Sequence, residues 1–148
     1  MLPPNHLLFS VIENQLAALE QRADRRAAAI PHFEAGRRIL TANHVGGDEL
    51  ANTDLELARC LLDVGNHVDA KSRAEEALDE LSRAGLGDLD RVVPWGVLAT
   101  VAAQRGQRAI AIGFAKRVLA ATTDADTGSK GEARTRMQKL LRAWRVSA

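Results

Sequence analysis

The 148-residue chain has one cysteine, no tyrosine, and aromatic residues at only 3% of its positions. A single cysteine cannot form an internal disulfide, so the fold is not a small disulfide-stabilised scaffold. No apolar run is long enough to cross a bilayer, and residues 1–10 lack the basic stretch, apolar stretch and small-residue cleavage site of a secretory signal. We therefore expect a cytoplasmic protein that does not enter the membrane.

Alanine is the most frequent residue, with 26 copies, and apolar residues make up 46% of the chain. Alanine, leucine, arginine and glutamate suit helices, whereas strands favour aromatic and β-branched residues. The apolar fraction argues against a disordered chain, and the length suits one domain. We therefore expect a single all-α domain that spans residues 1–148.

The formal net charge of +1 hides an uneven distribution of charge along the chain. Residues 48–90 carry four basic and twelve acidic side chains, for a net charge of −8, whereas residues 92–148 carry ten and three, for +7. This asymmetry favours an oriented partner, or a homo-oligomer in which acidic and basic surfaces meet, over uniform attraction to polyanions.

Seven helices are expected, at about 8–23, 26–42, 53–64, 67–84, 94–105, 107–121 and 129–145. Three of the starts depend on the capping-box pattern, a Ser or Thr followed three residues later by Glu: Ser10–Glu13, Thr53–Glu56 and Ser129–Glu132. A fourth start is placed at Pro94, because proline suits the first position of a helix.

A 41-residue repeat runs through most of the chain. Two sets of residues coincide at this spacing, namely Leu16, Leu57 and Leu98, and the turn residues Asp24, Gly65 and Gly106. A fixed period with two helices per repeat predicts stacked antiparallel helical hairpins that bury their apolar faces on one another. The hairpins are expected at about 8–42, 53–84 and 94–121, followed by a capping helix at 129–145. A plain antiparallel bundle with alanine-rich contacts is the alternative.

Two of the hairpins carry leucine and small residues in the same order. The third has Trp95, Leu98, Ala99, Ala102, Gly106, Ala111, Ala115 and Val118, and the second has Leu57, Ala58, Leu61, Gly65, Ala70, Ala74 and Ala77. This order resembles the repeat of the tetratricopeptide repeat (TPR) family, and the 41-residue spacing is similar to its longer, kinesin-light-chain-like variety. The resemblance covers about residues 10–121 and implies an α-solenoid of three hairpins.

The resemblance also implies that the first helices of the hairpins line a concave groove that holds a partner. The helix face opposite the packing stripe then supplies the groove residues: Asn14, Ala18, Asn52, Leu55, Arg59, Leu62, Asp63, Thr100, Ala103 and Gln104. In the second hairpin this face mixes apolar and charged side chains, as grooves for extended peptides do. The Lys/Asn pattern with which some family members clamp a C-terminal carboxylate is missing, so a chaperone-tail receptor is not expected.

The sequence contains none of the common motifs for catalysis or cofactor binding. It has no Gly-rich loop ending in Gly-Lys-Ser/Thr, no His-Glu-x-x-His, and no ligand spacing among its four histidines. Cys60 lies on an apolar stripe, which indicates a buried and inert thiol. We therefore predict a non-enzymatic protein- or peptide-binding module with no catalytic residue, metal site or cofactor. An all-α enzyme or small-ligand sensor with a dispersed site is the alternative.

The last expected helix offers a second candidate function, because cationic side chains line it: Arg134, Arg136, Lys139, Arg142 and Arg145. Its other side carries apolar residues, among them Met137 and Trp144. Such a helix can bind nucleic acid, an acidic partner or a membrane surface, and it also suits a cap that leaves its basic side in water. Single-stranded nucleic acid is disfavoured, because no aromatic side chain lies among the charges.

Overall fold

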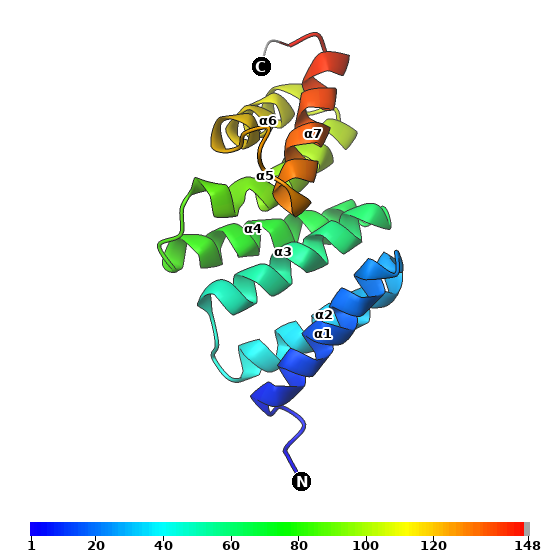
Figure 1. The fold of residues 1–148 in the computed structure, drawn as a ribbon, viewed down its shortest axis with the longest axis vertical. Helices are drawn as coiled ribbons and strands as arrows, with labels where there is room; N and C mark the ends of the chain where they lie inside the picture. Colours follow the sequence, from blue (N-terminus) through cyan, green and yellow to red (C-terminus); the bar gives the residue numbers. More distant parts are fainter. Residues whose placement is uncertain (147–148) are drawn as a thin grey trace. The chain divides into compact units, whose positions relative to one another are not determined.

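The computed structural model describes residues 1–146, so the last two residues of the expected 1–148 domain lie outside the described part. The described residues form seven helices and no strand, as predicted (Figure 1). The helices are α1 (Leu7–Arg22), α2 (Arg26–Ala42), α3 (Gly47–Asp63), α4 (His67–Arg83), α5 (Asp88–Gln104), α6 (Arg108–Ala121) and α7 (Gly128–Ala143). None of the helices in residues 1–146 is both long enough and apolar enough to span a membrane.

The 41-residue period is present in the helix bounds. The second helices of the hairpins start at Arg26, His67 and Arg108, and the first helices end at Arg22, Asp63 and Gln104. The turn inside each hairpin contains a residue in the left-handed region, with φ of 58° at Asp24, 84° at Gly65 and 73° at Gly106. Glycine adopts this conformation without steric cost, and aspartate is among the few other residues that tolerate it.

The chain divides into two compact units, residues 1–84 and residues 85 onward. The boundary falls at Gly85, in one of the glycine-containing breaks between hairpins. We call them the first unit and the second unit. The prediction of one continuous domain stays a prediction.

The first unit consists of two stacked hairpins, α1/α2 and α3/α4, with α3 packed on α2 (Figure 1). Alanines make up much of the buried core of this unit: Ala17, Ala29, Ala58, Ala70, Ala74 and Ala77 are completely buried. A Cβ atom added at Gly36 would lie 2.5 Å from Asn14 Oδ1, so any larger residue where α2 passes α1 would displace the Asn14 side chain. Small side chains therefore set how closely these helices approach one another.

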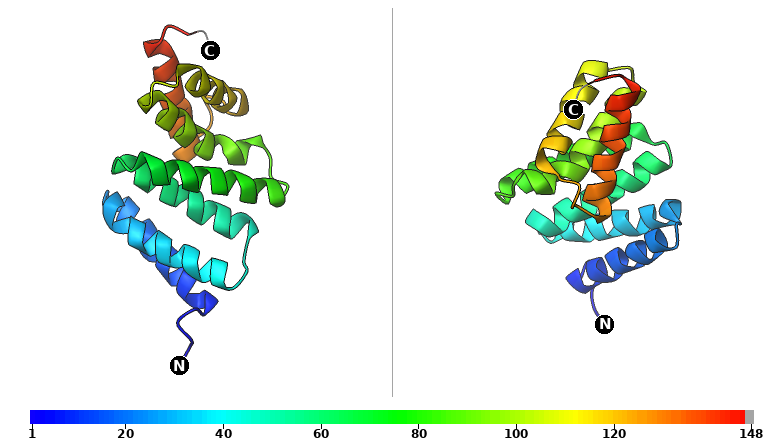
Figure 2. Two further views of the ribbon diagram at one scale, coloured as in Figure 1. Left: turned by 180° about the vertical axis from the view of Figure 1, so that it is seen from behind. Right: turned by 45° about the horizontal axis from the view of Figure 1, so that its top comes forward.

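The second unit consists of the hairpin α5/α6 and the capping helix α7, which packs on both helices (Figure 2). Met137 and Leu141 of α7 are buried against this hairpin, as the apolar side of a cap requires. Trp95 is buried in α5, and Trp144 stacks under the guanidinium of Arg108 with 5.4 Å to the ring centroid. The prediction of a capping helix is confirmed.

Two helices start earlier than predicted. α3 and α5 begin at Gly47 and Asp88, six residues before the expected starts at positions 53 and 94. Pro94 therefore lies inside α5. Both starts have an extended glycine at the N-cap and acidic residues in the first turn, which stabilise the positive end of the helix dipole.

All three capping-box predictions are wrong, because the hydroxyl residues lie inside the helices. Ser10 Oγ donates to the Leu7 carbonyl oxygen at 2.7 Å, and Thr53 Oγ1 donates to that of Glu49 at 2.9 Å. Ser129 follows the first residue of α7. A hydroxyl that bonds back to its own helix is the other common use of Ser and Thr in such patterns.

Candidate functional site

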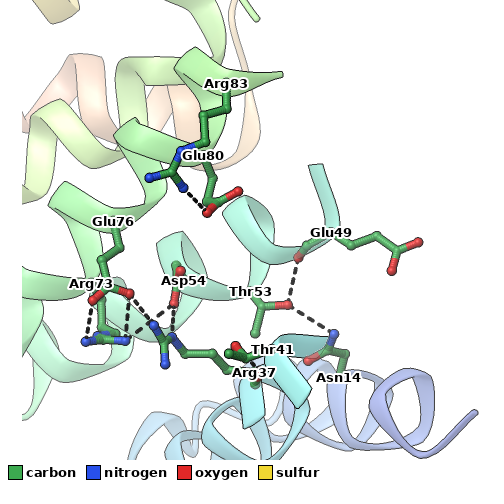
Figure 3. Close-up of polar contacts among 10 residues, drawn as sticks. All are labelled: Asn14, Arg37, Thr41, Glu49, Thr53, Asp54, Arg73, Glu76, Glu80 and Arg83. Atoms are coloured by element: carbon green, nitrogen blue, oxygen red, sulfur yellow. Dashed lines mark hydrogen bonds and ion pairs between the residues drawn. The ribbon is translucent and has the colours of Figure 1, made fainter. Parts of the chain in front are cut away.

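Four charged side chains of the first unit form a network that joins α2, α3 and α4 (Figure 3). We call Arg37, Asp54, Arg73 and Glu76 the Arg37 network. Arg37 Nε donates to Asp54 Oδ1 at 2.7 Å, and its Nη2 donates to Glu76. Arg73 forms a bidentate pair with Glu76, at 3.0 and 2.9 Å. The two arginines are thereby held in fixed orientations.

Asp54 is the buried centre of the Arg37 network, with its side chain only 1% exposed. Its Oδ2 atom is buried without a hydrogen-bond partner among the described residues. Burial raises the pKa of Asp54 above its ordinary value, against the opposing effect of the Arg37 and Arg73 charges. Burial disfavours the Arg37 cation as well, but the Asp54 and Glu76 carboxylates outweigh it and raise the pKa of Arg37.

A cleft of about 310 Å³ adjoins this network. We call it the α2–α4 cleft; its lining residues are Glu34, Arg37, Arg38, Leu57, Leu61, Asp69 and Arg73. The two leucines are buried and supply an apolar lining, while the other five side chains are charged. The cleft therefore combines three guanidinium groups with a small apolar surface.

Arg38 is the cation of this cleft that is available to a ligand. Its side chain is exposed and has no hydrogen-bond or ion-pair partner in residues 1–146. Arg37 also keeps one terminal nitrogen, Nη1, unbonded within the described residues. A second hollow of about 620 Å³, which includes Pro4, Asn5 and Glu13, shares both arginines. Arg37 and Arg38 thus line two adjoining depressions.

Seven of the ten predicted groove residues lie in the first unit. Asn52 and Asp63 are exposed, while Ala18, Leu55 and Arg59 are half-buried. Asp63 forms an ion pair with Arg26, and Arg59 Nη1 donates to Glu56 at 2.9 Å.

The other two groove residues of the first unit take part in the packing between its helices. Leu62 is only 8% exposed and offers little surface to a partner, and its assignment to the groove stays a prediction. Asn14 Nδ2 donates to Thr53 Oγ1 at 3.1 Å and joins the two hairpins (Figure 3). Both side chains lie in the packing between helices. The face that each helix exposes is therefore narrower than the face that the helical projection assigned to the groove.

The remaining three groove residues lie in the second unit, on α5. Gln104 is exposed and Ala103 is half-buried. Thr100 is also half-buried, and its Oγ1 donates to the Gly96 carbonyl oxygen at 2.8 Å. The ten predicted residues are thus divided between the two units.

Arg134 has a structural role that separates it from the other cations of the predicted basic helix. Its Nη1 donates to the carbonyl oxygens of Leu119 and Thr122, at 3.1 and 2.8 Å, and its Nε pairs with Asp124 at 3.1 Å. These acceptors lie at the C-terminal end of α6, where helix carbonyls lack partners within the helix. Arg134 therefore caps α6.

The other four cations, Arg136, Lys139, Arg142 and Arg145, are exposed. Their side chains have no hydrogen-bond or ion-pair partner in the described part of the chain. Arg136, Lys139 and Arg142 follow one another at three-residue spacing on α7, so they lie along one side of the helix. We call these three residues the α7 basic face.

Residues 1–146 contain no group of three or more His, Cys, Asp or Glu side chains that could hold a metal ion. Cys60 is fully buried, and burial raises the pKa of its thiol. Gln21 Nε2 donates to Cys60 Sγ at 3.4 Å. The thiol is therefore protonated at neutral pH and shielded from solvent, as its place on an apolar stripe predicted.

The Arg37 network and the cleft beside it were not predicted from the sequence. One signal was present: Asp54 precedes Leu57 and Ala58 by three and four residues, so it lies on the buried side of its helix. A buried carboxylate needs a cation beside it, because burying an unpaired charge costs free energy. No comparable signal distinguishes Arg38 from the other exposed arginines.

Comparison of the chain with protein-family models, curated proteins and solved structures gives no significant match.

Proposed function

We propose that this protein is a non-enzymatic module that binds a protein or peptide through the α2–α4 cleft. The observation that carries the proposal is Arg38, an exposed guanidinium without a partner in residues 1–146, beside the fixed Arg37 and two buried leucines. Guanidinium groups in fixed orientations recognise carboxylates through paired hydrogen bonds. The leucines are 2% and 5% exposed, so they add only a small apolar contact beside the arginines.

The chemistry of the cleft indicates a peptide with a carboxylate next to an aliphatic side chain. Three arginines line the cleft against two acidic side chains, and one of these, Asp69, is already bonded to Asn66. Because Arg37 and Arg73 are already paired with Asp54 and Glu76, the attraction for an anionic group comes from Arg38. It lies among the second helices of the two hairpins and α3, whereas the predicted groove lies on the first helices.

Selection from a random peptide library tests this proposal. The selected peptides should be enriched in Asp or Glu beside Leu, Ile or Val. Arg38→Glu should weaken their binding by about tenfold or more, because a charged hydrogen bond becomes a repulsion. Arg22→Glu is the matched control, since Arg22 is also exposed, unpartnered in the described residues and in the same unit. Peptides without acidic enrichment, or equal binding by the two variants, would refute the proposal.

The predicted groove on the first helices stays a separate prediction, and Arg59 is its most informative residue. Arg59→Glu should change the set of captured peptides if the groove is used. An unchanged set, together with a loss on Arg38→Glu, would assign binding to the α2–α4 cleft.

We also propose that the hairpins are TPR-like repeats and that the protein acts in the cytoplasm as a scaffold or regulatory subunit. The 41-residue spacing of the helix bounds supports the first part.

The α7 basic face supports a second candidate function, association with double-stranded nucleic acid. The second unit carries eleven basic and five acidic side chains, a net charge of +6. The three residues of the α7 basic face form no ion pair within the described residues. Phosphate contacts of this kind make affinity fall steeply with salt. Replacing Arg136, Lys139 and Arg142 with glutamate should abolish retention of duplex DNA or RNA at low salt.

The matched control for that variant changes three exposed cations of the first unit, Arg22, Arg38 and Lys71, to glutamate. The two variants have the same net charge, so a difference between them assigns binding to the α7 basic face. Absence of duplex retention by the wild type at low salt would remove this candidate.

A further inference from the structure

Helix α1 presents an exposed aliphatic surface along most of its length. We call this surface the α1 stripe; its residues are Leu7, Leu8, Val11, Ile12, Leu16 and Leu19, each between 40% and 56% exposed. Between Leu7 and Leu19 the one other exposed residue is Gln15. A contiguous apolar surface without charge is uncommon on a monomer and marks an interaction site.

The repeat register identifies part of this surface, Ile12, Leu16 and Leu19, as a docking face. The equivalents of the other three residues, at positions 48, 49 and 52, are exposed. Ile12 and Leu19 are 43% and 56% exposed, while their equivalents 41 residues later, Thr53 and Cys60, are 1% and 0% exposed. The first hairpin covers these equivalents, because α1 donates hydrogen bonds to both and α3 packs on α2. The face with which the second hairpin docks on the first is thus left uncovered on α1 within the described residues.

The charges around the α1 stripe suit a second copy of this chain. Residues 1–46 carry five basic and four acidic side chains, a net charge of +1, whereas residues 47–84 carry four and ten, for −6. Two first hairpins can therefore meet without strong like-charge repulsion. A lipid surface is a poorer match, because α1 has a single basic residue, Arg22, and interfacial helices have basic polar faces.

We propose that two copies of the chain associate through their α1 stripes, as an antiparallel pair of α1 helices. This contact is isologous: each stripe covers the other, and the assembly closes at two copies. Each copy contributes seven exposed residues of one helix, fewer than the roughly 20–30 residues a side of a stable interface. The dimer therefore forms in a concentration-dependent way and is weak.

Sedimentation velocity of the full chain over a hundredfold range of protein concentration tests the proposal. The wild type should shift from monomer to dimer and go no further. The double variant Val11→Glu, Leu19→Glu should remain monomeric, because each substitution puts a charge in the contact. Val68→Glu is the matched control, since Val68 is an exposed valine on α4, outside the stripe. Circular dichroism checks that each variant keeps its helices.

A cysteine at the centre of the stripe tests the symmetry of the contact. Gln15→Cys should give disulfide-linked dimers on mild oxidation, because antiparallel α1 helices bring the middle of each stripe together. Lys71→Cys, on exposed α4 surface, should give far fewer, and the native Cys60 is buried and does not contribute.

Three results would overturn the proposal. The first is a wild type that stays monomeric at every concentration. The second is a dimer that survives the Val11→Glu, Leu19→Glu variant. The third is association that grows beyond two copies and is lost in salt, which indicates a head-to-tail contact between the acidic and basic units. Arg38→Glu should leave the dimer intact, so the dimer and the proposed peptide site can fail separately.

Discussion

Leu16 and Leu57 occupy the same position of the repeat, yet removing their side chains should cost very different amounts of stability. Leu57 is 2% exposed and Leu16 is 40% exposed. Both residues lie on the first helix of a hairpin in the first unit, so Leu→Ala is a matched perturbation at the two sites.

The expected costs follow from the exposed fractions. Transfer of the three carbons lost in Leu→Ala is worth about 2.4 kcal/mol, at roughly 0.8 kcal/mol per methylene. At Leu57 a cavity term is added, which gives about 2.7–5 kcal/mol. At Leu16 only some 60% of the side chain leaves water and no closed cavity forms, so the cost is about 1.4 kcal/mol.

Urea unfolding followed by circular dichroism measures both values. Tryptophan fluorescence does not report on this unit, because Trp95 and Trp144 both lie in the second. The protein is kept dilute, so that any α1-mediated dimer has dissociated. Equal losses of unfolding free energy at an unchanged urea slope would refute the exposure of α1 on which the reasoning depends.

Three further predictions test other parts of the structure. Because burial raises the pKa of Asp54, the unfolded state loses its proton first as the pH rises above the ordinary value of 3.8. The unfolding free energy of the wild type should therefore fall relative to Asp54→Asn over that range in urea titrations; a rise would show that the ion pairs outweigh burial. Gly131→Ala should destabilise the second unit by about 1–3 kcal/mol, because its Cβ would lie 2.5 Å from a backbone carbonyl oxygen. Gly113→Ala has no neighbour within 4 Å and should stabilise it by about 0.5–1 kcal/mol, so thermal unfolding should move in opposite directions for the two variants. Arg134→Ala should lower the unfolding free energy by about 1–3 kcal/mol through loss of the α6 cap, whereas Arg136→Ala should change it by less than about 0.5 kcal/mol.

The repeat and the all-α fold could be predicted because they depend on many positions at once. The spacing of Leu16, Leu57 and Leu98 and the turn residues indicated three hairpins, and the six helices of these hairpins are present in the structure. Individual helix starts were less predictable, because one Ser or Thr can either cap a helix or bond back to its own helix. The acidic first turns at 48–49 and 88–90 were the better signal at α3 and α5.

The cleft could not be predicted, because it depends on side chains that are distant in sequence. Arg37 and Arg73 meet through Asp54 and Glu76 only when α3 packs on α2. A helical projection places Arg134 among the exposed cations, whereas the structure uses it to cap α6. Projection gives the face of a residue but not its partner on another helix, which is what separates binding groups from structural ones.

The exposed α1 stripe shows a similar limit. Its aliphatic residues look like core residues in the sequence, and three of their equivalents in α3, Thr53, Leu57 and Cys60, are indeed buried. The difference arises from what lies against each helix, which no local pattern records.

The central claim is that a peptide binds in the α2–α4 cleft. The most direct test is to map the amide chemical shifts that change when a selected acidic–aliphatic peptide is added to the isotope-labelled chain. We predict the largest changes at residues 34–38, 57–61 and 69–73, which line the cleft, and their loss in Arg38→Glu. Changes confined to groove residues outside these ranges, such as Asn14, Asn52 and Leu55, or to the α7 basic face, would contradict the account.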